Sequence, residues 1–367
     1  MASRSSARCA YTRTIALHLA DFWFDLPPEL VAQEPSPERG QSRLLVLTRA
    51  SGALEDRRFA DLPTLLGRGD LLVVNNTRVF AARLLGTRLP GGGRAECLLV
   101  RRLEATSPSD EIWEALVHPG QRLKEGSRLE LGSPRDRIHA EILDRRFHGR
   151  RHVRIWTDGG SIEGAVDRGG HVPLPPYIKR SDAPSDRERY QTIYARERGS
   201  IAAPTAGLHF TPKILAALDE HGIERAEITL HVGYGTFQPI RVERLAEHRM
   251  EPEHYEVPPE TAAAINRARA ERRRVIAVGT TTTRTLESVA TAEGSVNAGT
   301  GSTDLFIVPG YRFRVISALI TNFHLPQSSL LLLVSAFAGR EQVLGAYRHA
   351  VQNRYRFYSY GDANLIL

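Results

Sequence analysis

Four short apolar runs, each followed directly by polar residues, constrain the fold of this chain more than any other feature. The four junctions are Leu71–Val74 into Asn75–Arg78, Ile228–Leu230 into His231–Phe237, Val275–Val278 into Gly279–Arg284, and Val315–Ile320 into Thr321–Pro326. Continuous apolar runs of this length are typical of buried strands. In open α/β sheets, ligands bind at the carboxyl ends of the strands. If the four runs belong to one sheet, the polar segments meet at one edge and form a composite pocket.

The stretch Pro204–Thr211 places a histidine directly before the start of a helix. Thr211 is suited to the N-cap and Pro212 to the first helical turn, and Gly222 ends the helix. The free N–H groups at a helix N-terminus disfavour a charged imidazole, so we expect His209 to be neutral and able to act as a base. The alternative interpretation is a capped helix in which His209 only fills space.

The other polar segments also admit both a functional and a structural interpretation. Gly279–Arg284 leads into a helix and would hold a carboxylate or phosphate, although helix capping also explains its threonines. It is not a P-loop, because no Gly-Lys-Ser/Thr follows. Gly235 permits close approach of a ligand or serves a tight turn. His231 and His324 are either catalysts or hydrogen-bonded core residues, and Arg78 grips a carboxylate or pairs with a structural acid.

Composition limits the partners and the compartment. Lys and Arg exceed Asp and Glu by 49 − 42 = 7, and the isoelectric point near 9.6 suits a polyanionic partner without establishing one. The longest apolar run, Leu330–Ala338, is too short to cross a membrane. Cys9 and Cys97 build neither a disulfide framework nor a metal site, so we expect a reducing cytoplasm. His248 and His254 lack a recognised ligand spacing, and we expect no metal.

Short alternating segments separated by Gly- and Pro-rich turns predict a small antiparallel β-barrel at 81–164. It interrupts an α/β domain made of 21–80 and 165–367, in which we also expect strands at Leu305–Val308 and Phe313–Ile320. Residues 1–20 contain no acidic residue and are expected to be a disordered extension. The sequence therefore predicts an α/β domain with an inserted barrel.

The C-terminal stretch Tyr347–Tyr360 interleaves basic and aromatic residues. Stacking platforms beside cations are what single-stranded nucleic acid binding needs. The alternative is that these aromatic side chains pack on the sheet. A long polar connection, 171–200, is also expected to be functional or mobile because of its length. The nucleic-acid-binding candidates are Arg187, Arg189, Arg354, Tyr355 and Arg356.

Together, these segments resemble the S-adenosylmethionine:tRNA ribosyltransferase-isomerases of queuosine biosynthesis. The resemblance runs from about Phe24 to the C-terminus. The segments that carry it include Ser42–Leu45, Asn75–Val79, Leu174–Tyr177, Asp186–Thr192, Ala203–Thr211, His231–Pro239, Gly279–Thr283, Thr303–Ile307, Thr321–Leu325 and Tyr355–Ala363. Two departures stand out, since Glu251 occupies a position where His is expected and Asn364 one where Met is usual. They put local packing, and at most one substrate contact, in doubt.

The resemblance implies a three-layer α/β sandwich with an inserted β-barrel, and a monomeric cytoplasmic enzyme. It implies that the ribosyl part of S-adenosylmethionine moves onto the 7-aminomethyl-7-deazaguanine at the tRNA wobble position. The product is epoxyqueuosine, and adenine and methionine are released. S-adenosylmethionine is consumed as a substrate, and no cofactor is expected.

This reaction needs a base near the C5′ hydrogens that the sulfonium acidifies, and donors for charge on the ribose. We assign His209 as the base, and Asp304 as an acid or as the partner of the sulfonium or ammonium. The expected carboxylate or phosphate contacts are Arg78, Thr280, Thr281 and Thr282. The expected stacking residues are Tyr177, Phe237 and Phe323. The remaining predicted substrate contacts are Asn76, Thr205, His231, Gly235, Asn322 and His324.

Two alternatives stay open at this point. An S-adenosylmethionine-dependent RNA methyltransferase would release S-adenosylhomocysteine, but the glycine-rich first loop typical of that fold is absent. A noncatalytic RNA-binding module agrees with the basic isoelectric point and the C-terminal aromatic residues. Four convergent polar loops are more than such a module needs.

Overall fold

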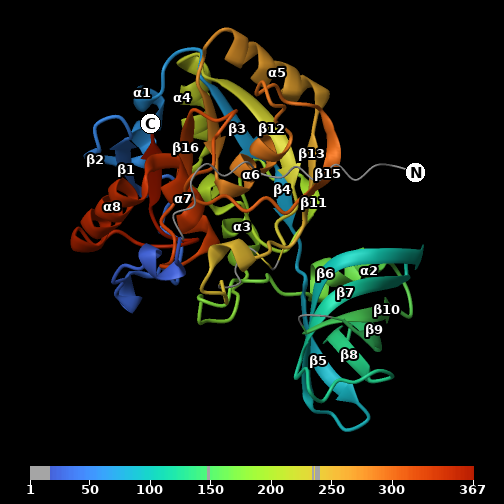
Figure 1. Cartoon of the computed structure of the whole chain (residues 1–367). Coiled ribbons are helices and arrows are strands. Elements are labelled where there is room, and N and C mark those ends of the chain that lie inside the picture. Colours follow the sequence, from blue (N-terminus) through green and yellow to red (C-terminus); the bar gives the residue numbers. More distant parts are fainter. Residues whose placement is uncertain (1–16, 147–148, 234, 236–239) are drawn as a thin grey trace.

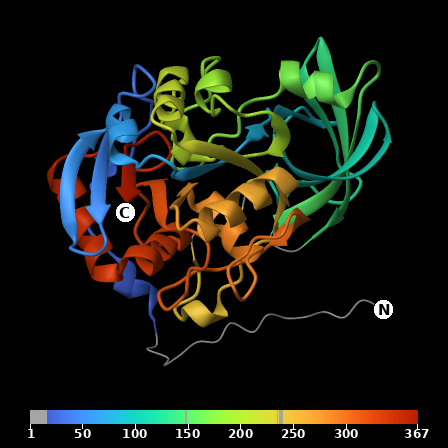
Figure 2. The same cartoon turned by 90° about the horizontal axis from the view of Figure 1, so that it is seen from above.

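The computed structural model describes residues 17–367 except 147–148, 234 and 236–239. The predicted stacking residue Phe237 lies outside the described residues. Figure 1 shows a large α/β part and a small barrel, and in Figure 2 strands β1 (Arg43–Thr48) and β2 (Ala53–Arg58) lie at the end of the sheet away from the barrel. A 3₁₀ turn at Leu19–Phe22 forms two residues before the predicted start of the α/β domain at Asp21.

A nine-stranded sheet forms the centre of the α/β part. Its order is β15 (Gly299–Thr303), β13 (Glu253–Val257), β12 (Glu224–Leu230), β3 (Leu71–Asn75), β14 (Val275–Val278), β16 (Ala318–Asn322), β17 (Ala363–Ile366), β1 and β2. The four strands β12, β3, β14 and β16 are adjacent and parallel. This confirms that the four polar segments leave the sheet at one edge.

Alternate residues of the central strands pack into two different cores. Leu71 and Val73 belong to the core on one face, and Leu72 and Val74 belong to the core on the other. Because side chains alternate across a strand, a continuous apolar run indicates burial on both faces. The result is the predicted three-layer sandwich.

Helices cover both faces of the sheet (Figure 1). The helices and short turns of the α/β part are η2 (Pro28–Leu30), η3 (Phe59–Asp61), α1 (Leu62–Leu65), α3 (Asp186–Arg189), η5 (Thr205–His209), α4 (Pro212–Glu220), η7 (Leu245–Glu247), α5 (Pro259–Ala270), α6 (Thr280–Ser288), α7 (Ser329–Ala338) and α8 (Arg340–Gln352). The predicted start of α4 is confirmed, because the Thr211 hydroxyl accepts the N–H of Ile214 at 3.1 Å and Pro212 is the first helical residue. Ser328 caps α7 in the same way.

The small part is a closed six-stranded barrel. Its strands are β5 (Arg83–Leu89), β6 (Arg94–Ser107), β7 (Asp110–His118), β8 (Arg128–Ser133), β9 (Asp136–Arg145) and β10 (Arg150–Trp156). Inward-facing residues such as Cys97, Leu99 and Ile155 fill it, and burial raises the pKa of the Cys97 thiol to about 12. Helix α2 (Ile162–Gly169) contacts β8 and β9. The parallel pair β4 (Thr77–Val79) and β11 (Glu197–Ser200) lies between barrel and sheet.

One expected strand is wrong, and another begins later than expected. Leu305–Val308 forms no strand, and the strand of that region is β15, immediately before it. Of Phe313–Ile320, only the part from Ala318 is extended into β16. The reason is a side chain, because the Glu287 carboxylate accepts the N–H groups of Arg314, Val315 and Ile316. These donors are therefore not available to a neighbouring strand.

Among the described residues, no single helix is long and apolar enough to cross a membrane. Of the described helices, only α7 and α8 taken together are long and apolar enough by length and composition, and they are bent by 116° relative to each other.

Candidate functional site

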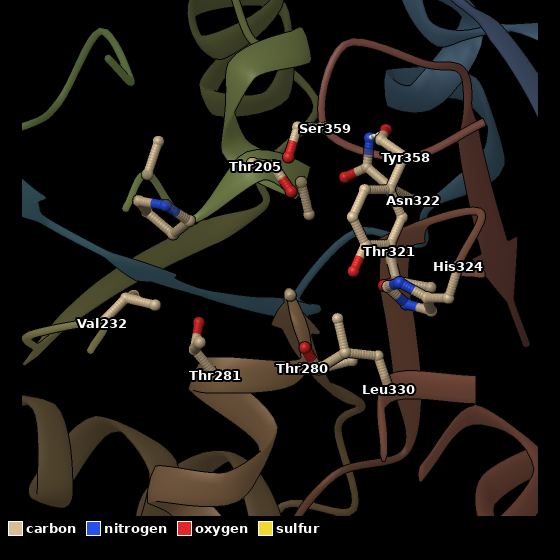
Figure 3. Close-up of a pocket in the computed structure, with 14 residues that line it drawn as sticks. Thr205, Val232, Thr280, Thr281, Thr321, Asn322, His324, Leu330, Tyr358 and Ser359 are labelled. Carbon is tan, nitrogen blue, oxygen red and sulfur yellow. Dashed lines mark hydrogen bonds between the residues drawn. The ribbon is translucent and has the colours of Figure 1, made fainter. Parts of the chain in front are cut away.

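A cavity lies at the carboxyl ends of the parallel strands, where the sequence predicts it. We call it the strand-end cavity; its volume is about 40 Å³. It is lined by Ala203, Pro204, Thr205, Ala206, Val232, Gly279, Thr280, Thr281, Thr321, Asn322, His324, Leu330, Tyr358 and Ser359. Three of the four predicted polar segments contribute to it, and Asn75–Arg78 does not. Figure 3 shows Thr280 and Thr281 facing Thr205 and Ser359 across the cavity.

The N-terminus of α6 supplies hydrogen-bond donors to this cavity. Gly279 precedes the helix with φ of 91°, a conformation that glycine adopts without strain. The first N–H groups of a helix have no intrahelical acceptor and favour an anion. Thr280 and Thr281 line the cavity, but Thr282 does not. Its hydroxyl donates to the Val278 carbonyl at 2.7 Å, so the predicted substrate contact of the Thr282 side chain is wrong.

Asn322, at the end of β16, presents an unused acceptor in the wall of the cavity. Its Nδ2 donates to the Tyr358 carbonyl at 3.1 Å and to Nε2 of His209 at 3.2 Å. Because the Tyr358 carbonyl can only accept a hydrogen bond, the amide nitrogen of Asn322 must face it, and this fixes the orientation of the amide. The Asn322 Oδ1 atom is buried and has no hydrogen-bond partner. A buried acceptor of this kind is costly unless a ligand donor satisfies it.

His324 is the histidine that reaches the strand-end cavity. Burial lowers its pKa to about 3, so the ring is neutral at pH 7. The Nε2 atom lies 3.0 Å from the Thr321 hydroxyl, which orients the ring. The backbone N–H of His324 donates to the Tyr347 hydroxyl at 3.2 Å. A neutral imidazole therefore stands in the wall of the cavity, held from two sides.

His209 is also neutral, but it lies behind the cavity wall. Burial, and then the charges of Arg356 and Arg39, lower its pKa to about 3. Its Nε2 accepts from Asn322, so Nδ1 carries the proton and donates to the Ser42 hydroxyl at 2.8 Å. Both ring nitrogens are thus occupied, and His209 does not line the strand-end cavity. The expected neutrality is found, but the expected direct approach to a substrate is not.

An aromatic and hydroxyl wall closes another side of the cavity. Tyr358 lines it with φ of 75°, a conformation that bulky residues adopt rarely and mostly at functional sites. Tyr177 packs edge-on against Tyr358, with ring centroids 3.9 Å apart, and its hydroxyl bonds to the Ser359 hydroxyl. Tyr177 therefore supports this wall from outside and does not line the cavity.

Several predicted site residues are elsewhere. Phe323 is fully buried in an aromatic core with Tyr347 and Phe357, so its predicted stacking on a substrate is wrong. The Asn76 amide donates to Glu227 and accepts from Thr229, which makes it structural. Asp304 and Arg78 are exposed and line none of the cavities described.

A second, much larger hollow, the interdomain cleft, lies between the barrel and the α/β part. Its volume is about 1320 Å³, and it shares Val232 with the strand-end cavity. Its charged lining residues are Arg101, Arg102, Glu111, Glu114, Arg146, Arg150, Glu163, Arg198, Arg249, Glu251 and Glu253. His231 lines this cleft with a pKa lowered by burial, and its Nδ1 lies 2.8 Å from the Thr77 hydroxyl.

Known proteins match this chain over nearly its whole length. A family model described as "Queuosine biosynthesis protein" matches residues 19–366. The chain belongs to the queuosine biosynthesis protein family. It is similar to the S-adenosylmethionine:tRNA ribosyltransferase-isomerase of Moorella thermoacetica, with 54% identity over 96% of this chain and 100% of the relative. The enzyme of the same name from Desulfitobacterium hafniense is 50% identical over 96% of this chain and 100% of its own length.

A solved structure of this family agrees. The crystal structure of the S-adenosylmethionine tRNA ribosyltransferase from Thermotoga maritima is 38% identical to this chain, with a TM-score of 0.53. The match covers 95% of this chain and 100% of that one. The resemblance predicted from the ordered set of motifs is therefore confirmed.

One departure from the expected family pattern links the two parts of the molecule. The Glu251 carboxylate accepts from Arg150 of β10, which also donates to Glu114 of β7 at 2.6 Å. Glu251 also lies against Gly235, where an added Cβ would meet its carboxylate oxygen at 2.8 Å. The residue thus forms an ion pair across the interdomain cleft.

The other departure leaves an unsatisfied amide. Asn364 of β17 is 1% exposed, and neither its Oδ1 nor its Nδ2 has a hydrogen-bond partner. It lies opposite Thr321 in the sheet, behind the strand-end cavity. A buried amide without partners is destabilising, which explains why an apolar side chain suits this position.

The predicted nucleic-acid contacts divide into three groups by their exposure. Tyr355 is fully buried, donates to Asp56 at 2.5 Å and lies under the Arg43 guanidinium, so its predicted role as a stacking platform is wrong. Arg187 is exposed and donates to the carbonyls of Asp167 and Gly170, and Arg354 is exposed. The other two, Arg189 and Arg356, are half-buried.

Within the part of the chain that the structure describes, there is no group of three or more His, Cys, Asp and Glu side chains that could hold a metal ion.

Proposed function

We propose that this chain is an S-adenosylmethionine:tRNA ribosyltransferase-isomerase. It transfers and isomerises the ribosyl part of S-adenosylmethionine onto 7-aminomethyl-7-deazaguanine at the tRNA wobble position, and releases adenine and methionine. The observation that carries this function is the 54% identity to an enzyme of that name over the enzyme's full length. The strand-end cavity, which the recognised motifs build, supplies the site for the chemistry.

The lining of the cavity suits a substrate that carries its own charges. Among the described residues, no Asp, Glu, Lys or Arg side chain lines it, so a sulfonium is not neutralised there and keeps its power to acidify the adjacent C5′ hydrogens. The donors at the N-terminus of α6 suit the methionine carboxylate. The free Oδ1 of Asn322 suits a donor such as a ribose hydroxyl, the ammonium or the adenine amine.

The size of the cavity decides how the substrates divide between the two hollows. A cavity of 40 Å³ has room for only a few atoms, since a single water needs about 10–15 Å³ on this measure. The cleft beyond Val232 has room for the rest of S-adenosylmethionine and for the wobble nucleotide. We therefore place the reacting atoms at the junction of the two hollows and the tRNA in the cleft.

Of the two neutral histidines, we place the base at His324, because its side chain lines the cavity. His324 would take the C5′ proton that the sulfonium acidifies. His209 acts through Asn322, whose amide it orients from behind, and is a positioning residue. Asp304 lies exposed outside the cavity and takes no part in this assignment. The proposal includes no cofactor, and a monomer in the cytoplasm remains our expectation.

The test is to incubate the protein with S-adenosylmethionine and tRNA bearing the aminomethyl-deazaguanine. Mass spectrometry of released small molecules and of the digested tRNA then identifies the reaction. We expect adenine and methionine, with a ribosyl-derived mass gain on the wobble nucleoside. Release of S-adenosylhomocysteine with a methyl gain would instead indicate a methyltransferase. Tight tRNA binding without products would indicate a noncatalytic module.

A further inference from the structure

A third, small hollow lies on the other side of η5 from the strand-end cavity. We call it the arginine pocket; its volume is about 20 Å³. Its lining residues include Arg39, Arg189, His209 and Ser359. Ser359 lines the strand-end cavity as well, so the two hollows share a wall. The assignment of the reaction above gives no role to Arg39 or Arg189, although Arg189 is among the predicted nucleic-acid contacts.

The two guanidinium groups that line the pocket donate to backbone carbonyls. Arg39 donates to Gln191 at 2.8 Å and to Glu188 at 3.1 Å. Arg189 donates to Ser36 at 2.5 Å and to Pro37 at 3.2 Å. These bonds hold the guanidinium groups in place and leave their charges without a carboxylate.

A third guanidinium group, that of Arg356, lies beside the same wall. It donates to the carbonyl of Tyr360, which lines the pocket, at 2.8 Å, and to the carbonyl of Glu34 at 3.2 Å. No ion pair joins any of the three arginines to a carboxylate in the described residues. By contrast, the nearby Arg180 is paired with Asp186 and Glu34, each at 2.6 Å.

Arg189 lies close enough to Arg39, and Arg39 and Arg356 lie close enough to His209, for their charges to affect these neighbours in the pocket wall. After burial, the charge of Arg189 lowers the pKa of Arg39, and the charges of Arg356 and Arg39 lower the pKa of His209. Glu188 raises the pKa of Arg39 but makes no ion pair with it. Like charges that a protein holds close together repel one another. An anion that binds between them offsets this repulsion, so its binding is favourable.

The shape of the pocket restricts that anion. A volume of 20 Å³ takes the oxygens of an anionic group but not a nucleobase or a sugar. Guanidinium groups match carboxylate and phosphate oxygens with paired N–H donors. The ligand is therefore an anionic group at the surface of a larger molecule.

We propose that Arg39, Arg189 and Arg356 bind a backbone phosphate of the tRNA. The inference rests on the proposed function, because that function makes tRNA the anionic partner of this chain; the arginine pocket shares Ser359 with the strand-end cavity. A second source of the same chemistry is the carboxylate of S-adenosylmethionine, which the experiment separates from a phosphate.

The experiment measures the affinity for tRNA bearing the aminomethyl-deazaguanine as a function of salt concentration. The variants are Arg189→Gln, Arg356→Gln and the double variant, with Arg57→Gln as the control. Arg57 is an exposed arginine of β2 paired with Glu55 at 2.7 Å. The control variant therefore loses one positive charge, as the others do, but away from the arginine pocket. Arg39 is kept, because its bonds to the carbonyls of Glu188 and Gln191 and to that of Leu208 in η5 join three segments of the chain.

We expect each single change to reduce the slope of log affinity against log salt by about 0.7, and the double change by about twice that, since each phosphate contact releases counterions. The control should keep the slope of the unchanged protein. Arg189→Lys and Arg356→Lys, which keep the charge, should retain most of the slope, and this separates charge loss from misfolding.

An unchanged slope in the double variant would overturn the proposal. So would a weaker affinity for S-adenosylmethionine alone together with an unchanged tRNA slope, because the pocket would then hold the methionine carboxylate. If the unchanged protein bound tRNA but released no adenine, the proposed function would fail. A reduced slope in the variants would still support the phosphate site.

Discussion

The strand-end cavity and the interdomain cleft adjoin at Val232 but are built from opposite kinds of residue. In the part of the chain that the structure describes, no charged side chain lines the cavity of about 40 Å³, and its histidine is held neutral by burial. The cleft of about 1320 Å³ is lined by many arginines and glutamates. The contrast separates two tasks, because a water-poor cavity strengthens the electrostatics of a reacting sulfonium, whereas exposed cations attract RNA.

The largest effect expected from this contrast concerns the two neutral histidines. His324→Ala should lower kcat by about 10²–10⁴-fold, because it removes a base that lines the cavity. His209→Ala should lower kcat by about tenfold or less, because it removes one hydrogen bond to Asn322. Turnover assays at saturating S-adenosylmethionine and tRNA compare the two. Near-normal turnover of His324→Ala with loss of turnover in His209→Ala would return the base to His209.

The next effect concerns a buried ion pair at the wall of the interdomain cleft. Arg284 of α6 and Glu253 of β13 are each 4% exposed, and Glu253 also accepts the N–H of Gly233 at 3.0 Å. Arg284→Met should reduce the free energy of unfolding by about 3–5 kcal/mol, because it removes the buried guanidinium that balances the charge of the Glu253 carboxylate. Urea unfolding measures this.

The control for this prediction is Arg267→Met. It breaks a half-exposed pair with Glu224 and should cost at most about 1 kcal/mol. If the two variants lost the same free energy of unfolding, burial of the Arg284 ion pair would not be the reason for its contribution to stability.

A smaller effect distinguishes the cavity region by its pH dependence. Folding holds the pKa values of His209 and His324 at about 3, whereas an unfolded histidine titrates near 6.5. As the pH falls below 6.5, the unfolded state binds protons first, so stability decreases until the pH reaches about 3. Between pH 6.5 and pH 5 each histidine should cost roughly 2 kcal/mol.

Urea unfolding at pH 7 and pH 5 tests this prediction. His209→Gln should reduce the difference between the two pH values by roughly 2 kcal/mol, the share of His209, and all other titrating groups cancel in the comparison. The same pH difference in the variant and the unchanged protein would contradict a buried neutral His209.

The smallest effect concerns the cleft. Glu251→Gln removes one carboxylate that faces Arg150 and should tighten tRNA binding a few-fold at low salt, because the cleft becomes more positive. Glu247→Gln, which removes an exposed carboxylate that is paired with Arg244 in η7, is the control and should leave the affinity unchanged. Weaker binding by Glu251→Gln would show that the ion pair to Arg150 positions the barrel for the tRNA.

The apolar runs and the helix cap in the sequence predicted the central strands of the sheet and the start of one helix. The apolar runs before Asn75, His231, Gly279 and Thr321 are adjacent parallel strands, and the cap at Thr211 starts α4. Strands β2 and β17 were not predicted, because Ala53–Arg58 is mostly polar and Ala363–Ile366 is only four residues long. Pairing with β1 decides both.

The sequence predicted which segments form the candidate site better than it predicted which side chains of those segments line it. Thr205, Thr280, Thr281, Asn322 and His324 do line the strand-end cavity. Phe323 stands between Asn322 and His324 in the chain, but its side chain packs into a hydrophobic core and not into the cavity. Neighbouring side chains at the end of a strand point in different directions. Tyr358 and Ser359, which also line the cavity, carry no signal beyond their place in a family motif.

By itself, the sequence determined the family, the sandwich with its inserted barrel, and the sheet edge at which the site lies. These follow from periodicity, capping and ordered motifs, which are local. Only the tertiary structure decided that His324 lines the cavity while His209 bonds Asn322 from behind, and that Arg39, Arg189 and Arg356 gather beside Ser359. These arrangements join residues more than a hundred positions apart, and packing between elements fixes them.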